Sequence, residues 1–242
     1  MPVPALLRQR RTWLIAIPVL VLLVAVVGPW VYINVLRDDP PERLTLADAT
    51  TTTAASGDAT STTEAGAAGG IEGTWVVGEG SVAGYRVKEV LFGQDAEAVG
   101  RTSEVTGSLE MAGTTVTAVE VTVDMASVTS DESRRDGQFR GRIMDTATHP
   151  TATFVLTEPI ELGELPAKGD EVSVAATGEL TLRGVTREVS FDITARRGPT
   201  SIDVSAAILL DFDDFQIPDA SGGPASVGRE GELELLLVFT RS

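Results

Sequence analysis

The chain has 242 residues, of which 35 are acidic and 19 are Lys or Arg, so its formal charge at pH 7 is −16. This balance argues against a nucleic-acid partner, because phosphate contacts require clusters of basic side chains. The chain has no cysteine, which excludes disulfides, thiolate metal sites and a cysteine nucleophile.

The first 36 residues indicate a single-pass membrane anchor. Residues 13–36, WLIAIPVLVLLVAVVGPWVYINVL, carry no charge. As a helix they would measure about 36 Å, long enough to cross the apolar core of a bilayer. Arg8, Arg10 and Arg11 precede them, so the positive-inside rule places residues 1–12 in the cytoplasm and the later chain outside it. The alternative is a cleaved signal peptide, although its apolar region spans only about 7–15 residues.

Residues 37–70 are predicted to form a disordered stalk. From Thr45 to Gly70 the chain consists mainly of Thr, Ala, Ser and Gly. Such a stretch cannot bury enough apolar surface to offset the entropy lost on ordering. Whether its threonines carry sugars is left open.

Residues 71–242 have the pattern of one all-β domain. Apolar and polar residues alternate in short segments separated by Gly, Pro and Asp, which is typical of antiparallel strands. Ala112-Gly113 and Arg183-Gly184 interrupt the alternation as tight turns do. We predict about eight strands, the clearest of which cover residues 99–111, 114–125, 152–156, 180–182, 189–193, 202–210 and 233–239.

A charged segment, SDESRRD, follows the second of these strands. Thr129 and Glu132 have the spacing of a capping box, in which a hydroxyl and a carboxylate bind the first free N–H groups of a helix. We therefore predict a short helix at this point.

Eight antiparallel strands form either a closed barrel or a two-layer sandwich. Long strands joined by short turns favour an extended up-and-down barrel. A barrel of this size either holds one ligand or is filled by its own side chains, and the sequence leaves both interiors open.

Acidic residues near the C-terminal end suggest calcium by composition alone. Asp211, Asp213, Asp214 and Asp219 lie close together in the chain. Their spacing does not match an EF-hand loop, so a solvated strand end is the simpler interpretation. We predict no metal site and no cofactor.

The sequence also offers few groups for catalysis. His149 is the only histidine, so a second one is not available to complete a metal site. We predict that the protein is not an enzyme. A hydrolase or isomerase acting through Asp124, Asp136 or His149 is the weaker alternative.

Four segments, in this order, resemble the YceI-like family of lipocalin-like, polyisoprenoid-binding proteins: VGRTSEVTGSLEMAG, VTVDMASVTSDESRRDGQFR, MDTATHPTATFVL and GELTLRGVTREVSFDI. A later segment, residues 214–217, matches a DFGI-like stretch of the family with Gln216 in place of its glycine. The residues that carry the resemblance are Gly107, Asp124, Ser127, Arg135, Asp136, Asp145, Pro150, Thr153, Phe154, Leu180, Thr181, Gly184, Val185 and Thr186.

The resemblance implies a barrel with a long apolar lumen that takes up an isoprenoid chain. Arg135, Asp136 and His149 are candidates for a polar mouth that meets the head group. The charged residues around Arg135 could instead brace the helix against the barrel. The candidate lumen residues are Tyr85, Val121, Val123, Phe154, Leu156, Leu182, Phe191, Val204, Ile208 and Phe215.

We therefore predict a membrane-anchored, extracytoplasmic protein that binds a polyisoprenoid or another long-chain amphiphile without catalysing a reaction. Its partners would be this ligand and the membrane, through the N-terminal helix, and a homodimer is left open. The alternative is a ligand-free envelope interaction or stress-response module with a packed core.

Overall fold

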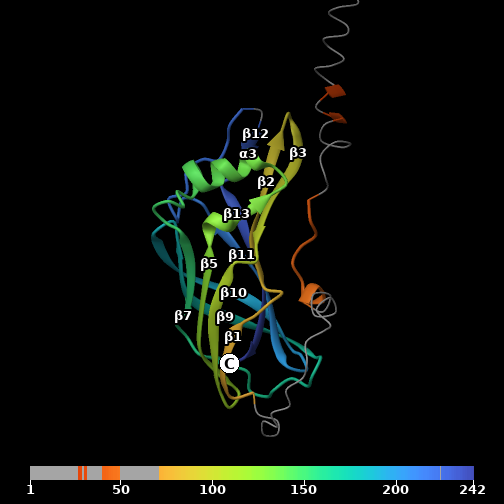
Figure 1. Cartoon of the computed structure of the whole chain (residues 1–242), viewed down its shortest axis with the longest axis vertical. Coiled ribbons are helices and arrows are strands. Elements are labelled where there is room, and N and C mark those ends of the chain that lie inside the picture. The colour runs from red at the N-terminus through yellow and green to blue at the C-terminus, as the bar shows by residue number, and fades with distance from the viewer. Residues whose placement is uncertain (1–26, 29, 32–39, 50–70, 224) are drawn as a thin grey trace, which may run out of the picture.

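The computed structural model describes residues 27–28, 30–31, 40–49, 71–223 and 225–242. The domain is an antiparallel barrel that is elongated along its axis (Figure 1). Of the described strands, eight form the ring: β1 (Gly73–Val77), β4 (Val105–Ala112), β5 (Thr115–Asp124), β7 (Thr151–Leu156), β9 (Glu171–Leu182), β10 (Val185–Arg197), β11 (Ser201–Asp211) and β13 (Glu230–Arg241).

The ring closes between its first and last strands. β1 pairs with β4 on one side and with β13 on the other, where Trp75 lies opposite Arg241. From β4 to β13, each ring strand pairs with the ring strand that follows it in the chain. This is the order of an up-and-down barrel, so the predicted fold class is confirmed for the described domain.

Tight turns join ring strands at the two positions predicted. Gly113, with φ of 62°, connects β4 to β5. Arg183 and Gly184 have φ values of 51° and 74° and connect β9 to β10. Two successive residues with positive φ are characteristic of a type I′ turn, whose twist matches that of the flanking strands.

Further strands and helical segments extend one end of the barrel. β2 pairs with the first half of β13, whose second half pairs with β1, so the β2–β3 hairpin lengthens the wall at that end. The helix crosses the same end (Figure 1). These elements are β2 (Val82–Leu91), β3 (Gln94–Thr102), η2 (Met125–Ser127), β6 (Thr129–Ser130), α3 (Ser133–Gln138), the π-helical turn η3 (Phe139–Ile143) and β12 (Ala225–Val227). The short strand β8 (Ile160–Glu161) pairs with the start of β5, at the other end of the barrel.

One predicted strand is divided in two. The alternation over residues 99–111 predicts a single strand, but β3 ends at Thr102 and β4 begins at Val105. The Thr102 hydroxyl accepts a hydrogen bond from the Glu104 N–H at 2.9 Å and lies 2.5 Å from the Ser127 hydroxyl. The chain changes partners at this break, because β3 pairs with β2 and β4 pairs with β5.

The charged segment forms helix α3, as predicted, but the predicted capping box is wrong. Thr129 lies in β6, and the N-cap residue is Glu132, whose side chain makes no capping hydrogen bond. Instead, the Asp136 carboxylate accepts hydrogen bonds from the N–H and the hydroxyl of Ser130, at 2.9 and 2.7 Å. A side chain within the helix therefore ties it to the preceding strand.

Part of the predicted stalk lies on the outside of the barrel. Residues 40–49, which we call the strap, run along the barrel wall and end in a helical turn at 46–49 (orange in Figure 1). Leu46 and Ala49 are 4% and 3% exposed and pack against Leu236 and Val238 of β13. The strap therefore covers outward-facing apolar side chains of the barrel.

The predicted membrane anchor, residues 13–36, lies almost entirely outside the described residues, as do residues 1–12 and 50–70. Within the described residues, no helix has both the length and the apolar composition needed to span a bilayer. The anchor, its orientation and the remainder of the stalk stay predictions.

Candidate ligand site inside the barrel

A cavity of about 660 Å³ occupies one half of the barrel interior. Its volume lies within the range of about 300–1,000 Å³ that ligand pockets span. Residues of α3, the β2–β3 hairpin and β12 line its outer rim, and these elements gather at the same end of the barrel (Figure 1). We call this space the upper cavity and that end its mouth.

Small side chains leave this space open. Ala83 on β2, Ala98 on β3 and Ala152 on β7 line the upper cavity, and all three are buried. The wall therefore offers an occupant many dispersion contacts and few hydrogen bonds. Larger aliphatic residues complete it: Val87, Val123, Leu180, Leu182, Ile208, Leu210, Leu233 and Leu235.

A second cavity, of about 110 Å³, lies further along the barrel axis and is called the lower cavity. Val121, Phe154 and Leu235 line both cavities. Phe239 lines the lower cavity and, together with Trp75, fills this end of the barrel; the two residues are 1% and 6% exposed. The interior is thus packed at one end and hollow toward the mouth.

Most of the predicted lumen residues line one of these cavities. Phe215 does not: it is 2% exposed and packs in the apolar cluster beside the upper cavity. The next residue, Gln216, has φ of 53°, a left-handed conformation that glycine adopts without strain. The predicted residues line the cavities as follows: Tyr85, Val123, Leu182 and Ile208 the upper; Leu156, Phe191 and Val204 the lower; Val121 and Phe154 both.

A charged pair stands at the mouth. Arg135 of α3 and Glu89 of β2 both line the upper cavity, with the guanidinium 3.3 Å from the carboxylate. Arg135 also pairs with Asp131. Glu89 is 7% exposed and was missed in the sequence. The signal for it was a charged residue in phase with Tyr85 and Val87 on the apolar face of a strand.

Tyr85 supplies a further polar group at the mouth. Its ring stacks on that of Phe139, with the ring centroids 5.1 Å apart. Burial raises the pKa of the Tyr85 phenol to about 12, although the nearby Arg135 acts in the opposite direction. The phenol therefore stays neutral at physiological pH and can donate a hydrogen bond to a ligand.

The other two predicted mouth residues lie outside the cavity wall. Asp136 is 9% exposed and holds Ser130, as described above. His149 lies over the β9–β10 turn, where a Cβ atom on Gly184 would come within 2.6 Å of its imidazole Cε1. Both side chains therefore contact the protein scaffold rather than the space at the mouth.

The groups considered for calcium or catalysis bind other protein groups. The Asp124 carboxylate accepts a hydrogen bond from the Ala126 N–H at 2.8 Å and caps η2. Asp213 accepts a hydrogen bond from Arg229 at 3.0 Å. No cluster of three or more His, Asp or Glu side chains in the described part of the chain could hold a metal ion.

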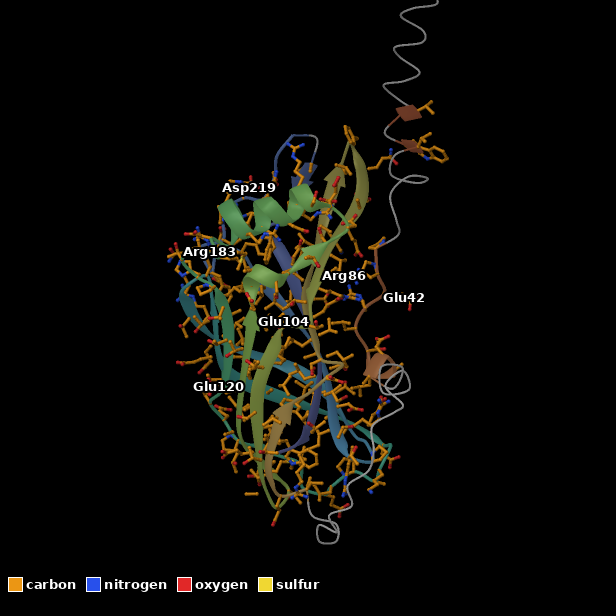
Figure 2. All side chains as sticks on the ribbon, in the orientation of Figure 1. Glu42, Arg86, Glu104, Glu120, Arg183 and Asp219 are labelled. Atoms are coloured by element: carbon orange, nitrogen blue, oxygen red, sulfur yellow. The ribbon has the colours of Figure 1, made fainter. Side chains whose placement is uncertain are left out.

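Buried charges gather on the outer surface, under the strap. Glu234 of β13 is 2% exposed and accepts hydrogen bonds from Arg86 at 2.6 Å and Arg101 at 3.0 Å. Arg86 also donates to Glu97 at 2.8 Å and to the Pro41 carbonyl at 2.7 Å. Figure 2 shows Arg86 on the side of the barrel that faces the strap. These charges connect the strap to the wall and take no part in the cavity.

Comparison with known proteins agrees with this architecture. Part of the chain matches bacterial relatives: it is 38% identical over 74 residues to a UPF0312 protein of Pseudomonas aeruginosa, and 36% identical over 75 residues to Protein YceI of Escherichia coli. These matches cover 30% and 31% of this chain and 35% of each relative, so the chain spans about a third of the length of the curated relatives it matches.

A solved structure shares the fold. It is a polyisoprenoid binding domain from Saccharophagus degradans implicated in plant cell wall breakdown. It superposes with a TM-score of 0.58 at 19% identity and covers 70% of this chain and 98% of that chain. Residues 75–239, more than half of the chain and nearly the whole barrel, match the model of the YceI-like domain, and the protein therefore belongs to the YceI-like family.

Proposed function

We propose that the barrel binds a polyisoprenoid in the upper cavity and carries it without chemical change. The observation that carries this proposal is the cavity of about 660 Å³ with its apolar wall. The related domain from Saccharophagus degradans is described as polyisoprenoid binding. An isoprenoid is long and uniformly apolar, and such a ligand needs a hydrophobic wall rather than a set of specific hydrogen bonds.

Burial of the hydrocarbon chain would drive uptake. Each methylene removed from water contributes about 0.8 kcal/mol. A five-carbon isoprene unit would therefore contribute up to about 4 kcal/mol before the cost of ordering the chain is subtracted. A few buried units are enough for stable binding.

The polar end of the ligand would stay at the mouth. Tyr85 and Arg135 can donate hydrogen bonds there, and Glu89 can accept one. Because Arg135 already pairs with Glu89 and Asp131, its charge is balanced before a ligand arrives. We therefore favour a neutral, hydroxyl-bearing end group over a phosphate.

We also propose that the N-terminal segment anchors the protein in the cell membrane, with the barrel on the extracytoplasmic side. The uncharged residues 13–36 and the arginines before them support this arrangement. The anchor would keep the barrel close to the bilayer from which an apolar ligand comes. Release of the full chain from membranes by a carbonate wash would contradict it.

The experiment is organic extraction of the full chain, purified from its native host, followed by mass spectrometry. Ala152→Phe fills the upper cavity, and Val155→Phe adds a ring to a residue of the same strand that is 43% exposed and serves as the matched control. We expect a stoichiometric isoprenoid in the wild type and in Val155→Phe, and its loss in Ala152→Phe.

Two results would count against the proposal. Equal amounts of isoprenoid in both variants would mean that the lipid comes from the surrounding membrane and not from the cavity. Empty extracts that remain empty after incubation with added polyprenols would favour the ligand-free interaction module.

A further inference from the structure

We propose that the aromatic pair Phe154–Phe191 sets the length of the chain that the barrel accepts, by closing the inner end of the upper cavity. Beyond this pair, the lower cavity would take the apolar end of a longer chain only when the partition is opened. This inference rests on the proposed function, because it concerns how the same cavity selects among isoprenoids of different length.

The Phe154 ring lies between the two cavities, and the Phe191 ring contacts it on the side of the lower cavity. Phe154 of β7 lines both, whereas Phe191 of β10 lines only the lower one. Their centroids are 5.3 Å apart and their planes meet at 66°, which is an edge-to-face contact. Together with Val121 and Leu235, which also line both cavities, the rings form a partition across the barrel.

A glycine in the neighbouring strand leaves room for the Phe154 ring. A Cβ atom on Gly178 of β9 would lie 2.5 Å from Cζ of Phe154 and 2.4 Å from the Val155 carbonyl oxygen. The ring therefore occupies the space that a side chain at position 178 would take. Glycine weakens the interior of a strand, so its presence here is explained by the close approach of both the ring and the Val155 carbonyl. The position of this ring in the partition is therefore matched by the residue of the strand beside it.

The lower cavity suits an apolar chain end and nothing polar. Its volume of about 110 Å³ is roughly one sixth of that of the upper cavity. Phe239 of its wall and the buried Trp75 fill this end of the barrel, and the Trp75 indole donates its hydrogen bond to the Ile71 carbonyl at 2.9 Å. The wall is mainly aliphatic and includes Val119, Leu156, Ala176, Ile193, Val204 and Leu237.

Removal of the Phe154 ring would join the two cavities. Each additional methylene that becomes buried raises affinity about fourfold. Two more buried methylenes would therefore raise the preference for a longer chain by about tenfold or more. A chain that already fits in the upper cavity gains little, so the preference among chain lengths changes.

The test compares polyprenols that differ by one isoprene unit, offered as an equimolar mixture. The full-length protein is reconstituted in nanodiscs of dimyristoylphosphatidylcholine, which contains no isoprenoid. Native mass spectrometry then gives the length of the retained polyprenol from its mass. The ratio of bound lengths is the readout, because an unfolded fraction of a variant binds no ligand and leaves the ratio unchanged.

Three variants are compared with the wild type. Phe154→Ala and Phe191→Ala each remove one ring of the partition. Phe215→Ala is the control, because Phe215 is a buried phenylalanine of the same barrel that lines neither cavity, whereas Phe154 and Phe191 are partly buried. We expect a sharp upper limit of length in the wild type and in Phe215→Ala. In Phe154→Ala we expect a shift of about tenfold or more toward longer chains, and in Phe191→Ala a shift in the same direction.

The outcomes separate this inference from the function on which it rests. If the wild type retains no polyprenol of any length, the proposed function fails. If the wild type binds polyprenols but shows no upper limit, or if Phe154→Ala and Phe191→Ala keep the wild-type distribution, the partition does not set the length. A shift in Phe215→Ala of the same size would also overturn it, because general loosening of the barrel would then explain the effect.

Discussion

The buried carboxylate of Glu234 is predicted to be essential to the stability of the barrel wall. Its side chain is 3% exposed and forms short ion pairs with Arg86 and Arg101 on two neighbouring strands, β2 and β3. Glu234→Gln removes the negative charge while keeping the shape of the side chain. Arg86 and Arg101 then lie close together without the charge of Glu234. The nearest carboxylate that Arg86 retains is that of Glu97, at 2.8 Å.

Removal of one partner from a buried ion pair costs about 3–5 kcal/mol. Because Arg86 retains Glu97, we expect a loss near the lower limit, about 3 kcal/mol. For a domain of this size, 1 kcal/mol corresponds to a change of about 2–4 °C in the melting temperature. The melting temperature should therefore fall by about 6–12 °C.

The assay is thermal unfolding of the full chain, followed by far-ultraviolet circular dichroism. Glu97→Gln is the matched control, because the Glu97 side chain is 33% exposed and partly exposed pairs contribute less than about 1 kcal/mol. If both variants melt within a degree or two of each other, burial of the Glu234 charge does not have the importance assigned to it here.

Three further predictions follow from the geometry. The Tyr85 pKa is raised from 10.0 to about 12, so the contribution of Tyr85 to stability should be constant below pH 10 and fall by about 3 kcal/mol between pH 10 and 12. Tyr32 is the other tyrosine of the chain, so the difference in absorbance between the wild type and Tyr85→Phe during a pH titration reports Tyr85 alone. A Tyr85 pKa near 10 would contradict its burial. Leu46→Asp should release the strap, seen as faster proteolysis within residues 40–49 while the barrel stays folded; a strap that remains protected would show that other contacts hold it. Gly107→Ala should destabilise by about 2 kcal/mol, because its Cβ would lie 2.2 Å from the Glu120 carbonyl oxygen, whereas Gly137→Ala, with open space around it, should stabilise slightly. Equal effects in urea unfolding would refute the steric argument.

The fold was predictable because its signals are local. Alternation of apolar and polar residues fixes which side chains face inward, and the turns at Gly113 and Gly184 fix where strands reverse. The capping box failed because Thr129 and Ser130 are held in β6, opposite Arg101 and Gly100 of β3. That pairing joins segments far apart in the chain, and helix-capping patterns do not detect it.

The residues that carry the family resemblance mostly shape the scaffold. Gly107 allows a close approach to β5, Asp124 caps η2, and Gly184 makes the β9–β10 turn under His149. Such residues specify the barrel and not its occupant. This is why the resemblance predicted the fold well and the mouth less well.

The strap was not predicted, although the sequence contains a signal for it. In β13 the alternation gives way to a continuous apolar run, in which the outward-facing Leu236 and Val238 alternate with the inward-facing Leu235, Leu237 and Phe239. A strand that is apolar on both faces must be covered on both. The strap is separated from β13 by most of the chain, and Leu46 and Ala49 are its only buried side chains. Composition alone therefore did not reveal that the strap covers β13.

The contrast between the two ends of the barrel favours a binding protein over a module with a packed core. At the closed end the chain fills the interior with Trp75 and Phe239, which shows that this ring of strands can accommodate large side chains. Toward the mouth, inward-facing positions of β2, β3 and β7 hold Ala83, Ala98 and Ala152. Empty apolar space lowers stability, because the residues around it lose their packing partners. An isoprenoid chain in the upper cavity would restore those contacts. The barrel should therefore be more stable with the ligand bound than when it is empty.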